Sequence, residues 1–229
     1  MIERGNEPRA HAGRTLRRAG YLLAALAFVP LSACRKDVAG TAVMEPSRLE
    51  ELPLPLAVPA GWDPVSYNLR RGNLGAVPES DLPLLNAPWG VREYLGAHLP
   101  YVVAPAGGVP AGYLALMWGD PELGYPPHPQ SMRGPVNDYG GNWFDWVRVR
   151  RATAYDVDEV ESRFSEWPKS LDTDRGRFTS LTGGSPQDDG GRNTVYLVAL
   201  PEGIQSGDLV RIHAHCKQHG EYVDFVRVP

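Results

Sequence analysis

The chain has 229 residues and a formal net charge of −4 at pH 7, with 27 acidic and 23 basic residues. This acidic balance argues against nucleic acid or anionic lipid as a direct partner, because those partners need clustered Lys and Arg. Glycine and proline supply 25 and 22 residues, a share below the roughly 25–30% that is typical of disordered chains. We therefore expect one globular domain with many turns and short elements.

The N-terminus carries a basic segment, an apolar segment and a cysteine, in that order. The apolar run Tyr21–Pro30 is ten residues long, too short for the roughly 20 residues of a membrane-spanning helix. Cys34 follows this run closely. Three arginines lie before the run and two small residues lie directly before the cysteine: Arg14, Arg17 and Arg18, then Ser32 and Ala33.

Residues 1–34 resemble the signal peptide of bacterial lipoproteins, with Leu31–Cys34 in the place of the lipobox. The resemblance implies that Cys34 is linked by a thioether to diacylglycerol and that the chain is cut just before it. Two or more acyl chains anchor a protein stably, because each buried CH₂ contributes about 0.8 kcal/mol. We therefore expect a protein of the cell envelope, anchored in membrane lipid through Cys34 and facing the periplasm.

The chain divides into three predicted parts: a signal peptide at 1–33, a Pro-rich membrane tether at 34–60 and a globular domain at 61–229. Loss of residues 1–33, with five Arg and two Glu, leaves the mature chain with a net charge of −7. Acylation of Cys34 leaves Cys216 as the lone thiol. Folding is then expected to depend on a hydrophobic core rather than on disulfides.

The first half of the domain predicts short elements. We expect a strand at 65–70, a helix at 91–98, and strands at 101–104 and 112–118. Residues 121–142 are rich in Pro and Gly and predict a long loop. Loops of this length in a compact domain are usually functional or mobile.

The second half shows clearer patterns. Alternating residues predict a strand at 143–151, and an apolar run predicts a buried strand at 193–200. Asp156 and Glu159 have the spacing of a capping box, which predicts a helix at 157–167. An apolar stripe supports this helix: Val157, Val160, Phe164 and Trp167.

Residues 208–216 and 221–228 predict a β-hairpin with His219-Gly220 as its turn. In this register His215 lies opposite Asp224. Alternation places one set inward, namely Val210, Ile212, Ala214 and Cys216, and another outward, namely Arg211, His213 and His215. The predicted fold class is α+β, mainly antiparallel β-sheet, either sandwich-like or a sheet packed by the helix at 157–167.

Histidines and a cysteine at short spacing around this hairpin are ligand types for zinc and copper. His213 and His215 share a strand face about 7 Å apart, which one metal ion can bridge. Cys216 points to the opposite face, so we expect it to be a small buried hydrophobe. The predicted metal site therefore consists of His213, His215, Asp224 and His219, and the alternative is a solvated polar sheet face.

A second candidate is a cluster of aromatic, acidic and histidine residues around the long loop. Such residues can line a groove for a sugar or a peptide, and they are equally typical of a core with Trp anchors. Asp120, His128 and Asp138 could also serve a hydrolase. The predicted binding surface consists of Trp118, Asp120, His128, Asp138, Tyr139, Trp143 and Trp146.

Several catalytic motifs are absent from the sequence: GxSxG, a phosphate-binding loop, HExxH and paired CxxC. The leading functional prediction is therefore a non-catalytic envelope lipoprotein that binds a protein or a cell-wall-associated ligand, for example an immunity or inhibitor protein. One alternative is a metal-binding lipoprotein that uses His213 and His215. The other is an unrecognised hydrolase at residues 118–146.

Overall fold

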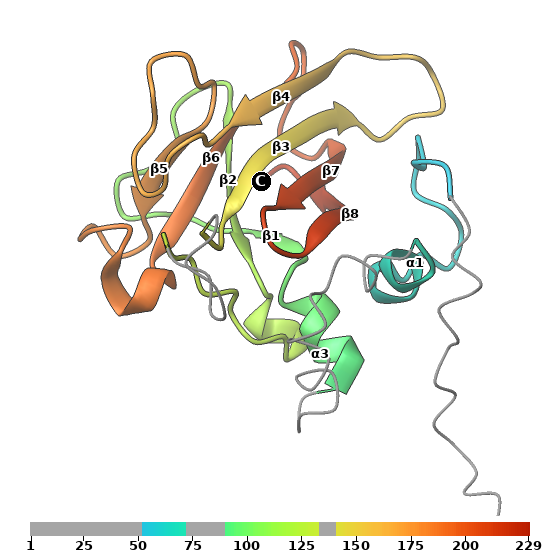
Figure 1. Cartoon of the computed structure of the whole chain (residues 1–229). Coiled ribbons are helices and arrows are strands. Elements are labelled where there is room, and N and C mark those ends of the chain that lie inside the picture. Colours follow the sequence, from blue (N-terminus) through green and yellow to red (C-terminus); the bar gives the residue numbers. More distant parts are fainter. Residues whose placement is uncertain (1–51, 72–89, 133–140) are drawn as a thin grey trace, which may run out of the picture. The chain divides into compact units, whose positions relative to one another are not determined.

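A computed structural model describes residues 52–71, 90–132 and 141–229, all within one compact unit that spans residues 44–229. The unit contains two four-stranded antiparallel sheets and a few short helices (Figure 1). The predicted α+β class with mainly antiparallel sheet is confirmed. The predicted signal peptide, Cys34, Asp138 and Tyr139 lie outside the described residues. Within the described ranges, no helix is long and apolar enough to cross a membrane.

The first sheet has the strand order β1-β2-β6-β5, and the second has the order β4-β3-β7-β8. The strands of the first sheet are β1 (Pro100–Val102), β2 (Tyr113–Trp118), β6 (Thr194–Ala199) and β5 (Arg177–Ser180). Those of the second are β4 (Glu159–Arg163), β3 (Phe144–Arg151), β7 (Leu209–Cys216) and β8 (Gly220–Arg227). Strand β5 was not predicted from the sequence.

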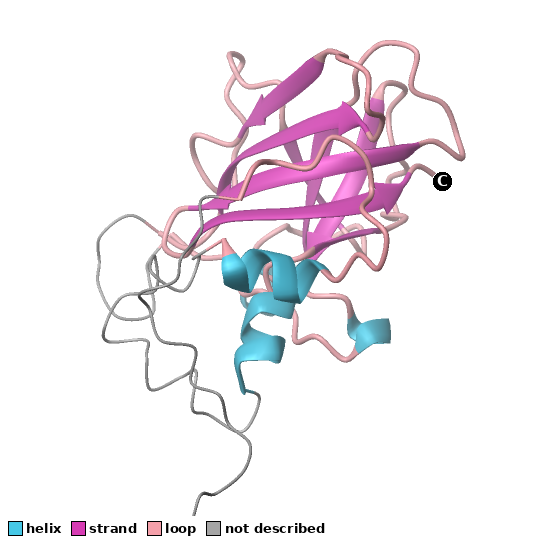
Figure 2. Cartoon of the chain, turned by 90° about the vertical axis from the view of Figure 1, so that its right-hand side faces the viewer, coloured by secondary structure: helices cyan, strands magenta, loops and turns pink. Residues whose placement is uncertain are grey.

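Two α-helices, α1 (Pro64–Arg70) and α3 (Gly90–Gly96), lie close together on one side of the strands (Figure 2). The prediction of a strand at 65–70 is wrong. Asp63 accepts hydrogen bonds from the backbone N–H groups of Val65 and Ser66 and so caps α1. Short 3₁₀ helices, η4 (Pro121–Leu123) and η5 (Asp188–Gly191), lie within loops.

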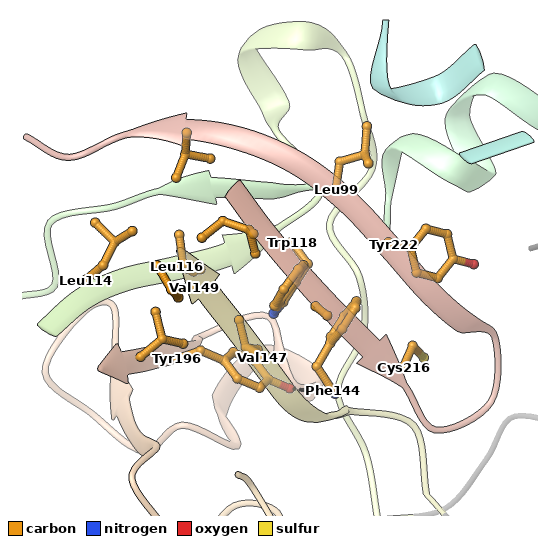
Figure 3. Close-up of a cluster of buried hydrophobic side chains, with 14 of the residues drawn as sticks. Leu99, Leu114, Leu116, Trp118, Phe144, Val147, Val149, Tyr196, Cys216 and Tyr222 are labelled. Atoms are coloured by element: carbon orange, nitrogen blue, oxygen red, sulfur yellow. Dashed lines mark hydrogen bonds between the residues drawn. The ribbon is translucent and has the colours of Figure 1, made fainter. Parts of the chain in front are cut away.

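The main hydrophobic core draws its side chains from both sheets (Figure 3). Phe144 of β3 is fully buried and stacks on Trp118 of β2, with ring centroids 3.6 Å apart. Tyr196 of β6 meets both rings edge-on. Because the rings come from three strands of two sheets, burying them ties the sheets together.

The predicted helix at 157–167 is wrong, since residues 159–163 form the edge strand β4 beside β3. Alternation puts two glutamates on one face, where Glu161 pairs with Arg148 and Glu159 pairs with Arg211. The apolar residues do have helical spacing in the sequence. Ion pairs of the two glutamates with arginines of β3 and β7 nevertheless favour the strand. Phe164 is still fully buried, just after the strand ends.

The hairpin of β7 and β8 forms, but its predicted register is wrong. Cys216 pairs with Gly220, so residues 217–219 make a three-residue loop and His215 lies opposite Glu221. Gly220 has a φ of 84°, the left-handed conformation that such a loop requires at its end. The inward set of β7 is confirmed by complete burial of all its members: Val210, Ile212, Ala214 and Cys216.

The outer face of β7 is covered at Arg211 and His213, whereas His215 is partly exposed. His213 is only 3% exposed. The backbone carbonyl of Pro55 accepts a hydrogen bond from Arg211, and that of Pro53 accepts one from Tyr67 of α1. The stretch around residues 53–55, which we assigned to the tether, therefore packs onto the domain.

Candidate metal centre

Four buried residues of metal-ligating type meet at one end of the core: His98, His128, Cys216 and His219. Each residue offers one ligand atom, and the four atoms lie within 4.8 Å of one another. Cys216 is the last residue of β7, and Figure 3 shows it beside the core aromatic residues. His219 belongs to the hairpin loop, His98 follows α3, and His128 follows η4.

The end of β2 brings His98 and His128 together. Pro100 of β1 pairs with Trp118, which fixes the chain just after His98. The backbone N–H of His128 donates to the carbonyl of Trp118 at 3.0 Å, so the loop after β2 folds back on the strand end. Pairing of β3 with β7, in which Phe144 is the partner of Cys216, places the thiol next to this loop.

Gly119 makes the return of this loop possible. Its φ is 84°, and a Cβ atom there would lie 2.0 Å from the carbonyl oxygen of Pro126. A side chain at this position would therefore push away the segment that carries His128.

The ligand atoms are separated by distances that suit a single metal ion. His98 Nε2 lies 2.9 Å from His219 Nδ1. Cys216 Sγ lies 3.4 Å from His219 Nδ1 and 3.7 Å from His128 Nε2. Zn–N bonds of about 2.0–2.1 Å and Zn–S bonds of about 2.3 Å give ligand separations of about 3.3–3.6 Å in a tetrahedron. Small side-chain shifts would therefore open the cluster to hold an ion.

His98 has a defined protonation pattern. Its Nδ1 lies 2.8 Å from the carbonyl oxygen of Tyr94, and a carbonyl can only accept, so Nδ1 carries the proton. The lone pair of Nε2 consequently faces the cluster. Ligating histidines commonly show this arrangement, with the second ring nitrogen donating to a backbone carbonyl.

The imidazoles of His98 and His128 are neutral near pH 7. Burial, with the positive charges that His128 and His219 would carry, holds the pKa of His98 well below its usual value. Burial and His219 lower the pKa of His128 to about 3, although the carbonyl of Pro129 acts in the opposite direction. Neutral imidazole is the form that binds metal ions.

The thiol of Cys216 is the group that a metal ion must deprotonate. Burial raises its pKa to about 12, while hydrogen bonds from the backbone N–H groups of Gln218 and His219 act against this. The thiol donates to Asn142 Oδ1 at 3.5 Å. The two backbone donors would stabilise the thiolate once a cation is bound.

The metal site predicted from the sequence is divided among different partners. His213 Nε2 lies 2.9 Å from Glu221, and His215 Nδ1 lies 2.6 Å from Asp145. Asp224 accepts a hydrogen bond from the indole of Trp62. Of the predicted set, His219 is the member that joins the buried cluster.

The predicted binding surface is divided as well. Trp118 and Trp143 are buried in the core, and Asp120 caps η4 by accepting from the backbone N–H of Glu122. Trp146 is half-buried on the outer face of β3, where it stacks on His215 and lies under Arg148. His128 is the member that joins the buried cluster, so the described members are divided among separate environments.

Sequence reasoning missed His98 and the meeting of Cys216 with three histidines. The available signal was the spacing Cys216-x-x-His219, which puts two ligands on one tight loop. The predicted inward direction of Cys216 is confirmed, but the predicted separation of its thiol from the histidines is wrong. The three-residue loop turns His219 inward instead.

Comparisons of the chain with protein-family models, with curated proteins and with solved structures give no match. The arrangement of residues described above is therefore the basis for a functional proposal.

Proposed function

We propose that this protein is an envelope lipoprotein, anchored through Cys34, whose globular domain binds one transition-metal ion at the buried centre of His98, His128, Cys216 and His219. The observation that carries the proposal is the convergence of one thiol and three imidazoles within 4.8 Å in the core. Thiolate and imidazole together favour zinc or copper over magnesium or calcium, which prefer oxygen ligands.

The cluster is an unusual element of a hydrophobic core. Burying polar groups is costly unless they are paired with one another or bound to a ligand. Here three imidazoles and a thiol face one another, with Cys216 Sγ 3.7 Å from His128 Nε2 and 3.4 Å from His219 Nδ1. A bound ion would engage these inward-facing atoms together.

The enclosure of the centre supports a binding role rather than catalysis. All four side chains are at least 95% buried. Catalytic zinc sites keep a position open for water or substrate, whereas closed sites hold or stabilise. We further propose that the domain binds a protein or a cell-wall-associated partner and not nucleic acid. This part of the proposal rests on the acidic sequence and the predicted lipid anchor.

Metal binding by the full-length lipidated protein tests this proposal. We expect the metal-free protein in detergent to bind one equivalent of Zn²⁺ or Cu⁺ in a competition titration with a chromogenic chelator. Cys216→Ala and His98→Ala should each abolish measurable binding, because each removes an inward-facing donor. Because Cys34 is acylated in this protein, Cys216 is the thiol that can contribute to metal binding.

His215→Ala is the matched control, because His215 lies on the outer face of the same strand and bonds Asp145. The metal affinity of the His215→Ala protein should equal that of the wild type. The proposal is refuted if the wild type binds neither ion, or if His215→Ala loses binding while Cys216→Ala, folded by circular dichroism, retains it.

A further inference from the structure

The buried centre can be loaded with an ion only if part of the protein moves. All four side chains are at least 95% buried, so an ion cannot reach their donor atoms while every segment stays in place. The ladder between β7 and β8 holds Cys216 and His219, and His98 lies between α3 and β1. His128 differs, because it lies within residues 125–130, which form neither helix nor strand.

Residues 120–130, named here the cover segment, are held loosely along most of their length. Residues 121–124 are exposed, and Leu123 is 67% exposed. Three of the five residues after Tyr125 are prolines, which have no backbone N–H to donate. Segments with few buried apolar contacts and few backbone hydrogen bonds open most readily. Of the segments that carry the four side chains, the cover segment is therefore the one best able to open.

Tyr125 ties the middle of the cover segment to the domain. It is the one buried residue among residues 121–127, all of which the structure describes. Its ring lies directly against Gly96 of α3, where a Cβ atom would lie only 2.1 Å from the ring atom Cδ1. The guanidinium of Arg92, one turn earlier on the same helix, lies 5.8 Å from the ring centroid. Opening of the segment must therefore break the contact between Tyr125 and α3.

Two glycines give the chain the freedom that such an opening needs. Gly119 lies just before the cover segment with a φ of 84°, and Gly124 lies within it with a φ of 76°. Glycine adopts positive and negative φ about equally readily, so both positions can act as pivots. The far end of the segment stays attached to the core, because Tyr196 donates a hydrogen bond to Gln130 Oε1 at 2.7 Å.

We propose that the cover segment is the part that opens to admit an ion to the buried centre, and that the contact of Tyr125 with Gly96 controls how fast the ion enters and leaves. This inference rests on the proposed metal-binding function and adds the route by which the site is loaded. Tyr125 is a positioning residue, because it acts through the segment that carries His128 and is not one of the four clustered side chains.

Rates of Zn²⁺ exchange by the full-length lipidated protein test the inference. Tyr125→Ala removes the ring and Gly96→Ala displaces it, so each variant should speed both uptake and release of Zn²⁺ by about tenfold. The affinity should change by less than about threefold, because one opening step precedes both entry and exit. Stopped-flow mixing with Zn²⁺, and with a competing chelator, measures the two rates. Leu123→Ala is the matched control on the same segment and should exchange Zn²⁺ like the wild type.

Labelling of Cys216 by a thiol reagent follows the opening without any metal. The thiol is fully buried, so it reacts only when the protein opens, and peptide mass spectrometry locates the label. Tyr125→Ala and Gly96→Ala should each speed this labelling by about tenfold at urea concentrations far below the unfolding midpoint. The rate should depend little on urea, because local opening exposes little surface.

Different outcomes separate the two proposals. If Zn²⁺ binds but both variants exchange it at the wild-type rates, the inference fails and the metal-binding function stands. If release alone accelerates and affinity falls in proportion, Tyr125 supports the bound state rather than entry, which also overturns only the inference. Labelling of Cys216 with the urea dependence of global unfolding would have the same consequence. If the wild type binds neither Zn²⁺ nor Cu⁺, the proposed function itself fails.

Discussion

At the residue scale, the chemistry of the centre depends on a thiol that the fold keeps protonated. Burial raises the pKa of Cys216 to about 12, so binding of a metal ion must displace its proton. The buried imidazoles of His98 and His128 are neutral near pH 7, because burial lowers the pKa of both, so metal binding does not have to discharge an imidazolium. Metal binding and proton release are therefore linked mainly through Cys216.

The first prediction is a dependence of metal affinity on pH. The metal-free thiol is protonated and the metal-bound sulfur is a thiolate, so binding weakens as pH falls. We expect the apparent affinity to change by about tenfold per pH unit between about pH 6 and 8, which corresponds to one proton. Chelator competition at several pH values measures this slope, and a pH-independent affinity would contradict the assignment of Cys216 as a ligand.

Asp224 gives a second residue-scale prediction, on stability. Burial raises the pKa of Asp224 to about 6, although Trp62 donates a hydrogen bond to it. The fold therefore favours the protonated form, and stability is lost as pH rises from about 4 through 6. Asp224→Asn keeps the acceptor for Trp62 but has no charge to bury.

We expect Asp224→Asn to raise the free energy of unfolding above pH 7 by about 1–2 kcal/mol and to have little effect near pH 4. Urea unfolding of the variant and the wild type at both pH values checks this. An equal effect at pH 4 and pH 7.5 would show that the carboxylate charge is not the cause.

At the element scale, the metal centre depends on strand ends and loops rather than on any one secondary-structure element. Strand β7 delivers Cys216, its hairpin loop delivers His219, and the chain on either side of β1–β2 delivers the other two histidines. Lys217 in the hairpin loop lies over the ring of Trp143 at 4.2 Å and donates its backbone N–H to the carbonyl of Trp143. The loop is thus held against β3.

Two glycines of the loop after β2 provide a matched pair of variants. Gly119 and Gly124 both have positive φ, but a Cβ at Gly119 would collide with Pro126 while a Cβ at Gly124 has open space. Gly124→Ala should cost about 1 kcal/mol for the backbone conformation. Gly119→Ala should cost at least about 2 kcal/mol more and should weaken metal binding, because it moves the segment that carries His128.

Denaturant unfolding and metal titration of the two variants measure these differences. Equal stabilities would mean that the close approach of Gly119 to Pro126 is unimportant. An unchanged metal affinity of the Gly119→Ala protein would mean that the loop does not position His128.

At the scale of the whole molecule, the domain has enough core to fold before it binds metal. The main cluster of buried hydrophobic residues draws on both sheets and on α1 and α3. This differs from zinc fingers, which are unfolded without their ion. The ion should therefore add stability to a domain that is already folded.

The last prediction is a metal-dependent shift in thermal stability. At a free metal concentration of about 100 times Kd, binding adds about 2.7 kcal/mol, or roughly 5–10 °C in Tm for a domain of this size. Cys216→Ala should show no such shift. Scanning calorimetry with and without metal checks both, and a metal-free wild type without a cooperative transition would contradict the independent core.

Sequence reasoning predicted much of the sheet and little of the centre. Most strands were found because alternation within a strand is local, and the inward direction of Val210, Ile212, Ala214 and Cys216 follows from it. The error at 157–167 arose because the same residues carry a helical stripe and an alternating set of charges. The choice between these patterns depends on arginines about 10 to 50 residues away.

The sequence by itself determined the inward face of β7, including the burial of Cys216, and, as predictions, the acidic mature domain and its lipid anchor. Only the tertiary structure decided that His98, His128 and His219 meet Cys216. Side-chain alternation is a property of a few consecutive residues. The meeting of these four side chains requires the pairing of β1 with β2, the return of the loop at Gly119 and the one register of the β7–β8 hairpin, which are contacts between distant parts of the chain.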